Sequence, residues 1–581
     1  MTDELLGLKN GLTNYGDRDF SLYLRRSFAL SMGMSRSLLQ KPVVGIAYTP
    51  SGFNNCHRHF PELLEAVKRG VLAAGALPLD FPTVSLGEGF LTPTSLRFRN
   101  LMAMDTEEMI RAQPMDAVVL MGGCDKTVPA QLMGALSADL PAIQLVGGPM
   151  MTGRYQGERL GACTDCRRFW GRFRAGDIGK TDIDAVESNL AITSGTCAVM
   201  GTASTMACLA EALGMMVPGS AAIPAVHADR LRAAEETGRL AVALIGSGRT
   251  PSKIITKESM ENAMRILLAL GGSTNAIIHL TAIAGRAGIE LTLDRLNELS
   301  ETTPVLVNLK PGGTHYMEDF HAAGGMGAVL RELKPLLHLD CLTVTGETLR
   351  QRLEGEDNWV GRDVIAPLEK PFEPKGGLVA LFGNLAPGGA ILKRSAADSR
   401  LFEKEGRVVV FSSLEDLANR IDDPDLDVTA DDFLLLQNAG PHSQSGMPEA
   451  GYLPIPKKLA AQGVKDMVRI SDARMSGTAF GTIVLHVTPD AASGGPLALV
   501  QNGDRIRISV EGRSIELLVS DQELDRRRAE MPAKVSPRRR GYDKLYAEHV
   551  TGADAGCDFD FMQQLPQDNE QRDVSGKTAN V

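Results

Sequence analysis

The chain has 581 residues, of which 43% are hydrophobic and 23% charged, and its formal net charge at pH 7 is −10. This length exceeds one ordinary hydrophobic core and predicts about two to four domains. The negative charge argues against a nucleic-acid partner, and the absence of any run of about 18 apolar residues argues against a membrane span.

Cysteine usage and the N-terminus indicate the compartment. Eight cysteines in a chain of this length do not form the dense pattern of a disulfide scaffold. Residues 1–6 lack the basic and apolar regions of an export signal. We therefore expect a cytoplasmic protein, in which thiols are structural, catalytic or metal-binding.

Up to about residue 370, short apolar runs alternate with helical patterns. This alternation is typical of a mostly parallel sheet covered by helices. The predicted strands are 43–48, 116–121 and 142–146, and the predicted helices are 60–74, 202–213 and 258–270.

After residue 372 the pattern changes to short, β-branched runs separated by turn residues. The predicted strands are 378–382, 407–411, 433–437, 482–487, 505–510 and 514–519. We therefore predict an α/β protein with a large N-terminal α/β domain, residues 1–372, and a C-terminal β-barrel-like domain, residues 373–581.

The tripeptide Cys124-Asp125-Lys126 follows one of the predicted strands and two glycines. Open α/β sheets bind ligands at the C-terminal ends of their strands, which is where this loop would lie. Thiolate sulfur selects iron–sulfur clusters or zinc, whereas carboxylate oxygen selects magnesium or manganese. One short loop could therefore serve two different metals.

Two further cysteines, Cys56 and Cys197, share the setting of Cys124, each lying just after an apolar run or just before a helix. A single buried cysteine is commonly a packing residue, but three in matching settings indicate a shared cluster. Their spacing lacks the compact pattern of a ferredoxin. The pair Cys163 and Cys166 forms a CxxC without a second half-site, and its basic neighbours favour an exposed loop without a function.

Candidate hard ligands are Asp125, Glu88 and Glu449, of which the two glutamates lie in loops rich in Gly or Pro. For each glutamate the alternative is simple solvent exposure. The loop 471–478 could bind an anion or position a serine, and its alternative is a turn held by an Asp472–Arg474 pair. Three loop histidines are expected to form hydrogen bonds rather than to bind metal: His57, His59 and His442.

The glycine-rich segments 270–275 and 383–389 do not predict a nucleotide site. Neither contains the Gly-Lys-Ser/Thr ending of a P-loop, and neither fits the GxGxxG pattern.

Together these segments resemble the dihydroxyacid and sugar-acid dehydratase family. The resemblance rests on residues 124–129, 195–206, 270–275, 383–389 and 472–477, and runs from near residue 40 to near residue 560. Residues 471–481, 487–496 and 541–561 are more similar to the sugar-acid branch, of the pentonate and hexonate (L-arabinonate) type, than to the branched-chain amino-acid branch.

The resemblance implies two cofactors. It implies an iron–sulfur cluster, 2Fe–2S rather than 4Fe–4S, on Cys56, Cys124 and Cys197. It also implies Mg²⁺ on Glu88, Asp125, Glu449 and Lys126, with the lysine carboxylated by CO₂ and so converted from a cation to a ligand. Ser476 matches the catalytic base, Lys126 also counts as catalytic, and we predict that Arg474 and Thr478 contact the substrate.

The implied activity is that of a hydro-lyase acting on a small anionic substrate. Removal of water from a 2,3-dihydroxy sugar acid would give a 2-keto-3-deoxy acid. The alternatives are a dihydroxyacid dehydratase of branched-chain amino-acid synthesis, acting on 2,3-dihydroxyisovalerate, and an enzyme acting on both substrates. A non-catalytic iron–sulfur protein would not need gathered carboxylates. The resemblance also implies a homodimer or homotetramer.

Overall fold

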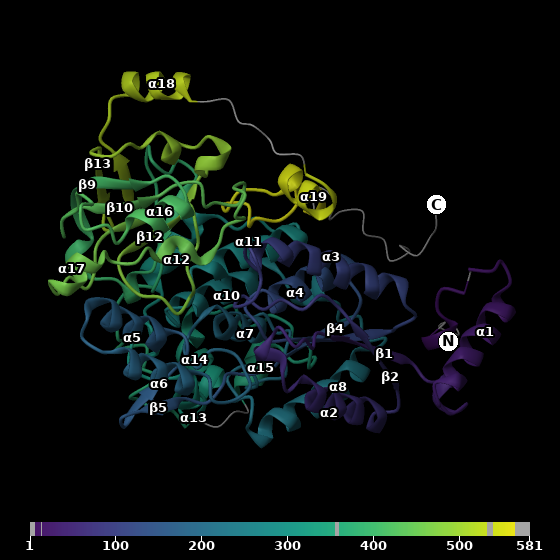
Figure 1. The fold of residues 1–581 in the computed structure, drawn as a ribbon. Helices are drawn as coiled ribbons and strands as arrows, with labels where there is room; N and C mark the ends of the chain where they lie inside the picture. The colour runs from purple at the N-terminus through teal and green to yellow at the C-terminus, as the bar shows by residue number, and fades with distance from the viewer. Residues whose placement is uncertain (1–5, 13, 355–358, 532–538, 564–581) are drawn as a thin grey trace.

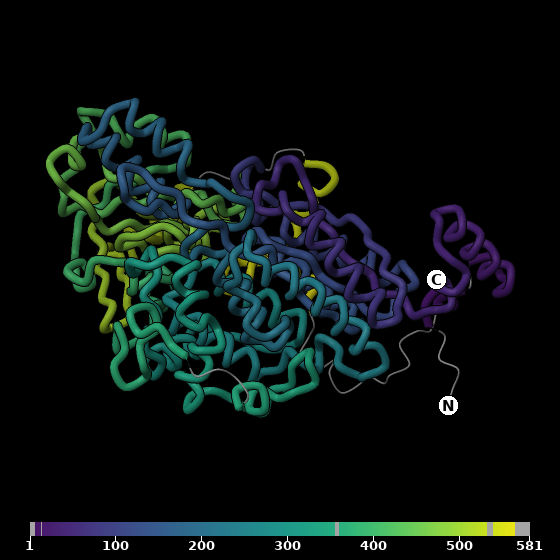
Figure 2. The backbone as a smooth tube through the Cα atoms, turned by 90° about the horizontal axis from the view of Figure 1, so that it is seen from below, coloured from purple at the N-terminus to yellow at the C-terminus, as the bar shows by residue number. Residues whose placement is uncertain are grey.

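The computed structural model describes residues 6–12, 14–354, 359–531 and 539–563. It contains two main sheets with helices packed around them (Figure 1). Helix α1 (Arg18–Ser31) projects from the body in both views (Figures 1 and 2). Among the described residues, no helix combines the length and apolar character needed to cross a membrane.

The first sheet is parallel, with strand order β2-β1-β3-β4. Its central strands are continuous apolar runs because both faces are buried. Helices α3 and α4 cover one face, and α2 and α8 cover the other (Figure 1). The bounds are β1 Val43–Tyr48, β2 Leu77–Pro82, β3 Ala117–Gly122, β4 Ala142–Val146, α2 Phe60–Ala73, α3 Leu96–Ala112, α4 Thr127–Ala138 and α8 Ala228–Leu244.

Helices α2 and α8 pack closely through small residues. A Cβ on Gly70 would lie 1.9 Å from the carbonyl oxygen of Glu235, and one on Gly238 would lie 2.3 Å from that of Val67. Glycine is therefore required at this crossing.

The second sheet is mixed, with strand order β14-β13-β9-β10-β11-β12-β8-β7. Its edges meet where Ile515 N donates to the Phe382 carbonyl oxygen at 2.8 Å, next to a bridge between Phe382 and Ser514. The sheet is therefore a nearly closed barrel. Its strands are β7 Val379–Leu381, β8 Gly389–Leu392, β9 Glu403–Phe411, β10 Phe433–Leu436, β11 Arg469–Ser471, β12 Ile483–Thr488, β13 Arg505–Ser509 and β14 Ser514–Leu517.

The other elements connect the sheets or cover them. A short hairpin precedes helix α5, which packs against α17 beside the barrel. These elements are β5 Gly153–Tyr155, β6 Glu158–Leu160, α5 Thr164–Ala175, α6 Lys180–Leu190, α7 Thr202–Ala212, α9 Pro251–Ile254, α10 Lys257–Ala269, α11 Asn275–Arg286, α12 Leu293–Thr302, α13 Met317–Ala322, α14 Gly325–Glu332, α15 Leu349–Glu354, α16 Leu414–Arg420, α17 Lys457–Ala461, α18 Asp521–Glu530 and α19 Gly541–His549.

The predicted fold class is confirmed. Every predicted strand and helix has a counterpart in the structure, most within two residues, whereas strands β2, β5, β6, β8 and β11 were not predicted. The boundary near residue 372 stays a prediction, although all strands of the barrel follow it.

Candidate functional site

Three loops bring the predicted cluster cysteines together. Cys56 lies in a short 3-10 helix, Asn55–His57, after β1, and Cys124 follows β3. The C-terminal ends of parallel strands meet at one sheet edge, which explains this proximity. Cys197 precedes helix α7.

The electrostatic environment of the thiols reflects this proximity. A hydrogen bond with the Cys56 thiol, together with burial, raises the pKa of Cys124. The pKa of Cys197 is raised by a hydrogen bond with Cys163, by burial, and by the charges of Cys163, Cys56 and Cys124. The three predicted ligands therefore share one site, and a fourth thiol joins them.

The expectation that Cys163 and Cys166 lie in an exposed loop is wrong. The Sγ atoms of Cys163 and Cys197 are 3.5 Å apart, and the Cys166 thiol donates to the Cys163 carbonyl oxygen at 2.7 Å. Cys163 immediately precedes α5, whose first residue, Thr164, donates from Oγ1 to the Thr478 carbonyl oxygen at 2.8 Å. This bond holds the start of the helix within the site.

His57 supports the Cys124 loop through the backbone. The Cys124 N–H donates to His57 Nε2 at 3.0 Å, and His57 Nδ1 lies 2.8 Å from the Thr49 carbonyl oxygen. Burial lowers the pKa of His57 to about 4, so the ring is neutral and can accept this bond. The other two loop histidines form hydrogen bonds elsewhere, His59 to the Gly147 carbonyl oxygen and His442 to Asp490.

The three predicted carboxylates also meet. Glu88, Asp125 and Glu449 each offer an oxygen within 4.8 Å of the others. Glu88 follows β2, Asp125 follows Cys124, and Glu449 begins a 3-10 turn, Glu449–Tyr452, between β10 and β11. The first sheet and the barrel therefore contribute to one acidic group.

Two buried cations compensate these carboxylates. Arg474, with a fully buried side chain, donates from Nη1 to Glu449 at 2.7 Å and from Nη2 to Glu88 at 2.9 Å. Its Nε donates to the Met447 carbonyl oxygen at 2.9 Å, and the Lys126 ammonium pairs with Asp125.

The pKa values of the two glutamates shift in opposite directions. Burial disfavours ionisation of Glu88, but Arg474 and Lys126, with the hydroxyls of Ser95 and Thr94, hold its pKa at about 2. Burial and the neighbouring carboxylates raise the pKa of Glu449 against the effect of Arg474. Like charges held this closely push two pKa values apart.

The donor atoms fit both implied groups. Three carboxylate oxygens form the hard donor set that Mg²⁺ prefers, and three convergent thiols form the soft set of an iron–sulfur cluster. Because Cys124 and Asp125 are adjacent in the chain, the two sets lie side by side.

The Ser476 loop connects β11 to β12. Ser476 Oγ lies 2.9 Å from Thr478 Oγ1, which accepts a hydrogen bond from Arg167 Nη1 at 2.9 Å. Asp472 accepts from the N–H groups of Ala439 and Ala491 at 3.0 and 2.9 Å, and burial raises its pKa to about 7. An Asp472–Arg474 pair, the alternative raised for this loop, does not form.

Lys393 and Arg167 were not identified from the sequence. The Lys393 ammonium is buried and donates to the Gly477 carbonyl oxygen at 3.4 Å, and burial lowers its pKa to about 7. No sequence signal marked Lys393, whereas Arg167 belongs to the CxxC segment that was set aside.

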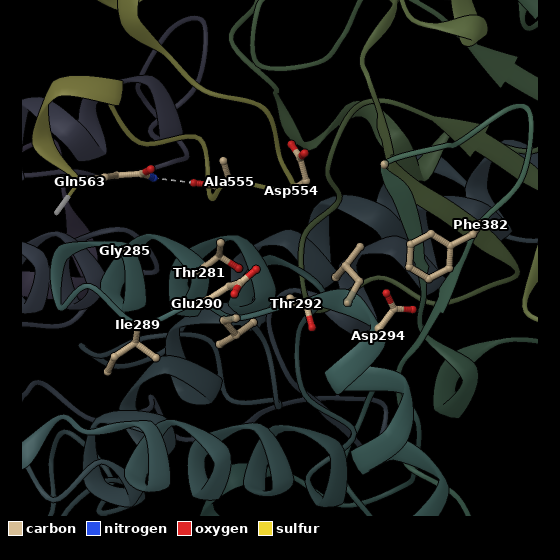
Figure 3. A pocket seen from close by; sticks show the side chains of 13 residues that line it. Thr281, Gly285, Ile289, Glu290, Thr292, Asp294, Phe382, Asp554, Ala555 and Gln563 are labelled. Carbon is tan, nitrogen blue, oxygen red and sulfur yellow. Dashed lines mark hydrogen bonds between the residues drawn. The ribbon is translucent and has the colours of Figure 1, made fainter. Parts of the chain in front are cut away.

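A cavity of about 320 Å³ lies elsewhere, between α11, the start of α12 and residues 554–563 (Figure 3). Thr281, Asp294 and Phe382 line it, and the Gln563 amide donates to the Ala555 carbonyl oxygen at 2.9 Å beside it. None of the predicted site residues contributes to its wall.

Comparison with known proteins identifies the class. Residues 41–352 match the N-terminal domain, and residues 363–557 the C-terminal domain, described as dihydroxy-acid/6-phosphogluconate dehydratase. The chain belongs to this family of dehydratases, which are hydro-lyases.

Individual relatives align along nearly the whole chain. A 6-deoxy-6-sulfo-D-gluconate dehydratase of Pseudomonas putida is 46% identical over 93% of this chain and 94% of its own length. An L-arabinonate dehydratase of Rhizobium leguminosarum bv. trifolii is 46% identical over 94% and 95%. A dihydroxy-acid dehydratase of Caldanaerobacter subterraneus is 38% identical over 92% and 96%.

Proposed function

We propose that this protein dehydrates a sugar acid with 2,3-hydroxyls to a 2-keto-3-deoxy acid. The observation that carries the proposal is the junction of three thiols and three carboxylates at Cys124-Asp125. A relative named for a sugar acid is 46% identical, against 38% for one named for a dihydroxy acid. This difference favours the sugar-acid branch.

The family is known for an iron–sulfur cluster and Mg²⁺. We assign the cluster, of the 2Fe–2S type, to Cys56, Cys124 and Cys197. The Mg²⁺ ligands would be Glu88, Asp125 and Glu449, with Lys126 as its carbamate. When bound, these groups supply Lewis-acid stabilisation of the substrate carboxylate, its 2-hydroxyl and the leaving 3-hydroxyl.

Ser476 would remove the proton from C2 of the substrate. A hydroxyl is a weak base at neutral pH and needs stabilisation of its alkoxide. Thr478 can provide part of it, because its oxygen accepts from Arg167 and its own proton is free to point at Ser476 Oγ. Loss of the 3-hydroxyl then gives an enol, which tautomerises to the 2-keto acid.

The Ser476→Ala variant tests this role. Turnover should fall about 10²- to 10⁴-fold, as expected for loss of a positioned base, while the visible absorbance of the cluster is unchanged. Near-normal turnover with intact absorbance would remove Ser476 from the mechanism.

A substrate panel tests the function. The anaerobically purified protein is assayed for 2-keto acid formation on pentonates, hexonates and 2,3-dihydroxyisovalerate. We expect turnover on at least one sugar acid to exceed turnover on 2,3-dihydroxyisovalerate. The reverse order would assign the protein to branched-chain amino-acid synthesis. We further propose a cytoplasmic homodimer or homotetramer, which light scattering would test.

A further inference from the structure

Arg167 lies on the side of the Ser476 loop that faces helix α5. Its Nη1 donates to Thr478 Oγ1 at 2.9 Å and to the Cys163 carbonyl oxygen at 3.3 Å. Its guanidinium carbon lies 5.5 Å from the centre of the Tyr452 ring, which supports the flat face of the group. The side chain is therefore fixed in orientation beside the proposed base.

The remaining donors of Arg167 are free. Arginine has five N–H groups, and those on Nε and Nη2 make no hydrogen bond to any residue in the described part of the chain. No carboxylate among those residues forms an ion pair with it either. By contrast, the neighbouring Arg168 pairs with Glu158 and Asp165.

The position of Arg167 relative to the carboxylate group indicates what these donors would meet. Arg474 binds Glu88 and Glu449 at the proposed metal end of the site. Ser476 lies two residues further along the chain and contacts Thr478, which accepts a hydrogen bond from Arg167. A substrate held at the metal end by its C1 carboxylate, with C2 at Ser476, would extend its later carbons towards Arg167.

We propose that Arg167 binds a second oxyanion at the end of the sugar acid that is distant from C1. This inference rests on the proposed function and specifies its substrate class as aldonates with a terminal sulfonate, phosphate or carboxylate. A planar guanidinium can bind such an oxyanion through two parallel hydrogen bonds. Because Arg167 has no carboxylate partner, the oxyanion would not have to displace one.

The test compares neutral and charged substrates on the complete, cluster-containing enzyme. The substrates with an uncharged terminal hydroxyl, called neutral below, are D-gluconate and D-galactonate. The charged ones are 6-phospho-D-gluconate, 6-deoxy-6-sulfo-D-gluconate, D-glucarate and D-galactarate. We expect at least one charged substrate to have a kcat/KM about 10- to 100-fold above that of its neutral parent, as for a charge-assisted hydrogen-bonded pair. The anion that gains most identifies the natural terminal group.

The Arg167→Gln variant should lose this preference. We expect kcat/KM for the charged substrate to fall about 10- to 100-fold further than kcat/KM for the neutral parent. The loss common to both substrates arises because Thr478 loses its hydrogen bond from Arg167. Arg167→Lys should recover part of the preference, because it restores the charge without the fork. Arg172→Gln, an exposed arginine of the same helix, serves as the matched control and should keep the preference.

Two results would overturn the inference. One is a wild-type enzyme that prefers the neutral sugar acids. The other is an Arg167→Gln variant, with normal cluster absorbance and melting temperature, that loses neutral and charged substrates equally. Either would leave the dehydratase proposal standing, whereas absence of turnover on every sugar acid would refute the proposed function itself.

Discussion

The two ends of the candidate site differ in how their polar groups are satisfied. At the carboxylate end, Glu88 and Glu449 share Arg474, and Asp125 pairs with Lys126. At the α5 end, Arg167 has spare donors, and Cys163 adds a thiol beyond the three that the family implies. The first end is internally compensated, and the second has capacity left for a ligand.

This difference teaches which residues tolerate replacement. Breaking a buried, compensated ion pair leaves an unpaired charge in a medium of low dielectric constant, which is costly. Removing a side chain that makes few hydrogen bonds or ion pairs within the protein leaves few polar groups without a partner. Substitutions at the two ends should therefore differ in their effect on stability.

The largest effect on stability is expected for Arg474→Met. Its removal leaves Glu88 and Glu449, which are partly buried, beside each other without their shared cation, and we expect the free energy of unfolding to fall by about 3 kcal/mol. Pulse proteolysis in urea measures this change. Arg400→Met, which removes an exposed arginine from its pair with Asp398, is the control and should change the free energy of unfolding far less, because solvent screens exposed ion pairs. Equal effects of the two variants would contradict the comparison.

A pH-dependent effect is expected for Lys393→Met. The unfolded lysine has its ordinary pKa of 10.5, whereas burial lowers the folded value to about 7. Between these values the unfolded state binds more protons, so the stability of the wild type falls as the pH falls from 10.5 to 7. The variant lacks a lysine that must be protonated inside the protein at low pH. At pH 6 its free energy of unfolding should therefore exceed that of the wild type by a few kcal/mol.

The same proteolysis assay at pH 6 and pH 9.5 tests this expectation. The difference in the free energy of unfolding between the variant and the wild type should be smaller at pH 9.5 than at pH 6. A gap that is independent of pH would show that the Lys393 ammonium stays charged and compensated in the folded protein.

The smallest effect is expected for Cys163→Ala. The variant should keep the visible absorbance of the cluster and change the free energy of unfolding by about 1 kcal/mol or less. Cys197→Ser, which alters the thiol 3.5 Å away, should lose the absorbance. Loss of the visible absorbance in Cys163→Ala would indicate that Cys163 is a fourth cluster ligand, and would contradict the view that the α5 end has an unused thiol.

The fold was largely predictable from the sequence because hydrophobic periodicity is a local signal. Strand β1 occupies the predicted residues 43–48, and β4 the predicted residues 142–146. Strands β8 and β11 were missed because they are short and lie beside glycine-rich or charged segments, so that pairing within the barrel rather than local propensity determines them.

The membership of the site was only partly predictable. The Cys124-Asp125 junction is visible in one tripeptide, but the partners of Arg474 are up to 386 residues away along the chain. Sequence reasoning predicted that Arg474 contacts the substrate. Three of its nitrogens bind Met447, Glu449 and Glu88, so a contact with substrate stays a prediction. Cys163 was set aside because its CxxC has no second half-site and has basic neighbours, and spacing along the chain gives no information on its distance to Cys197.

Helix α5 is fastened at both ends to the barrel. Thr164 binds the Thr478 carbonyl oxygen at its start, and Arg174 binds Asp422 through two hydrogen bonds of 2.7 and 2.6 Å near its end. The reacting groups lie on other segments. After gene duplication, replacements within one turn of this helix could therefore change which sugar acids are bound, while Ser476 and the predicted metal ligands stay in place. A replacement of Asp422, which binds the far end of α5, could also change this substrate selectivity by altering the tilt of the helix.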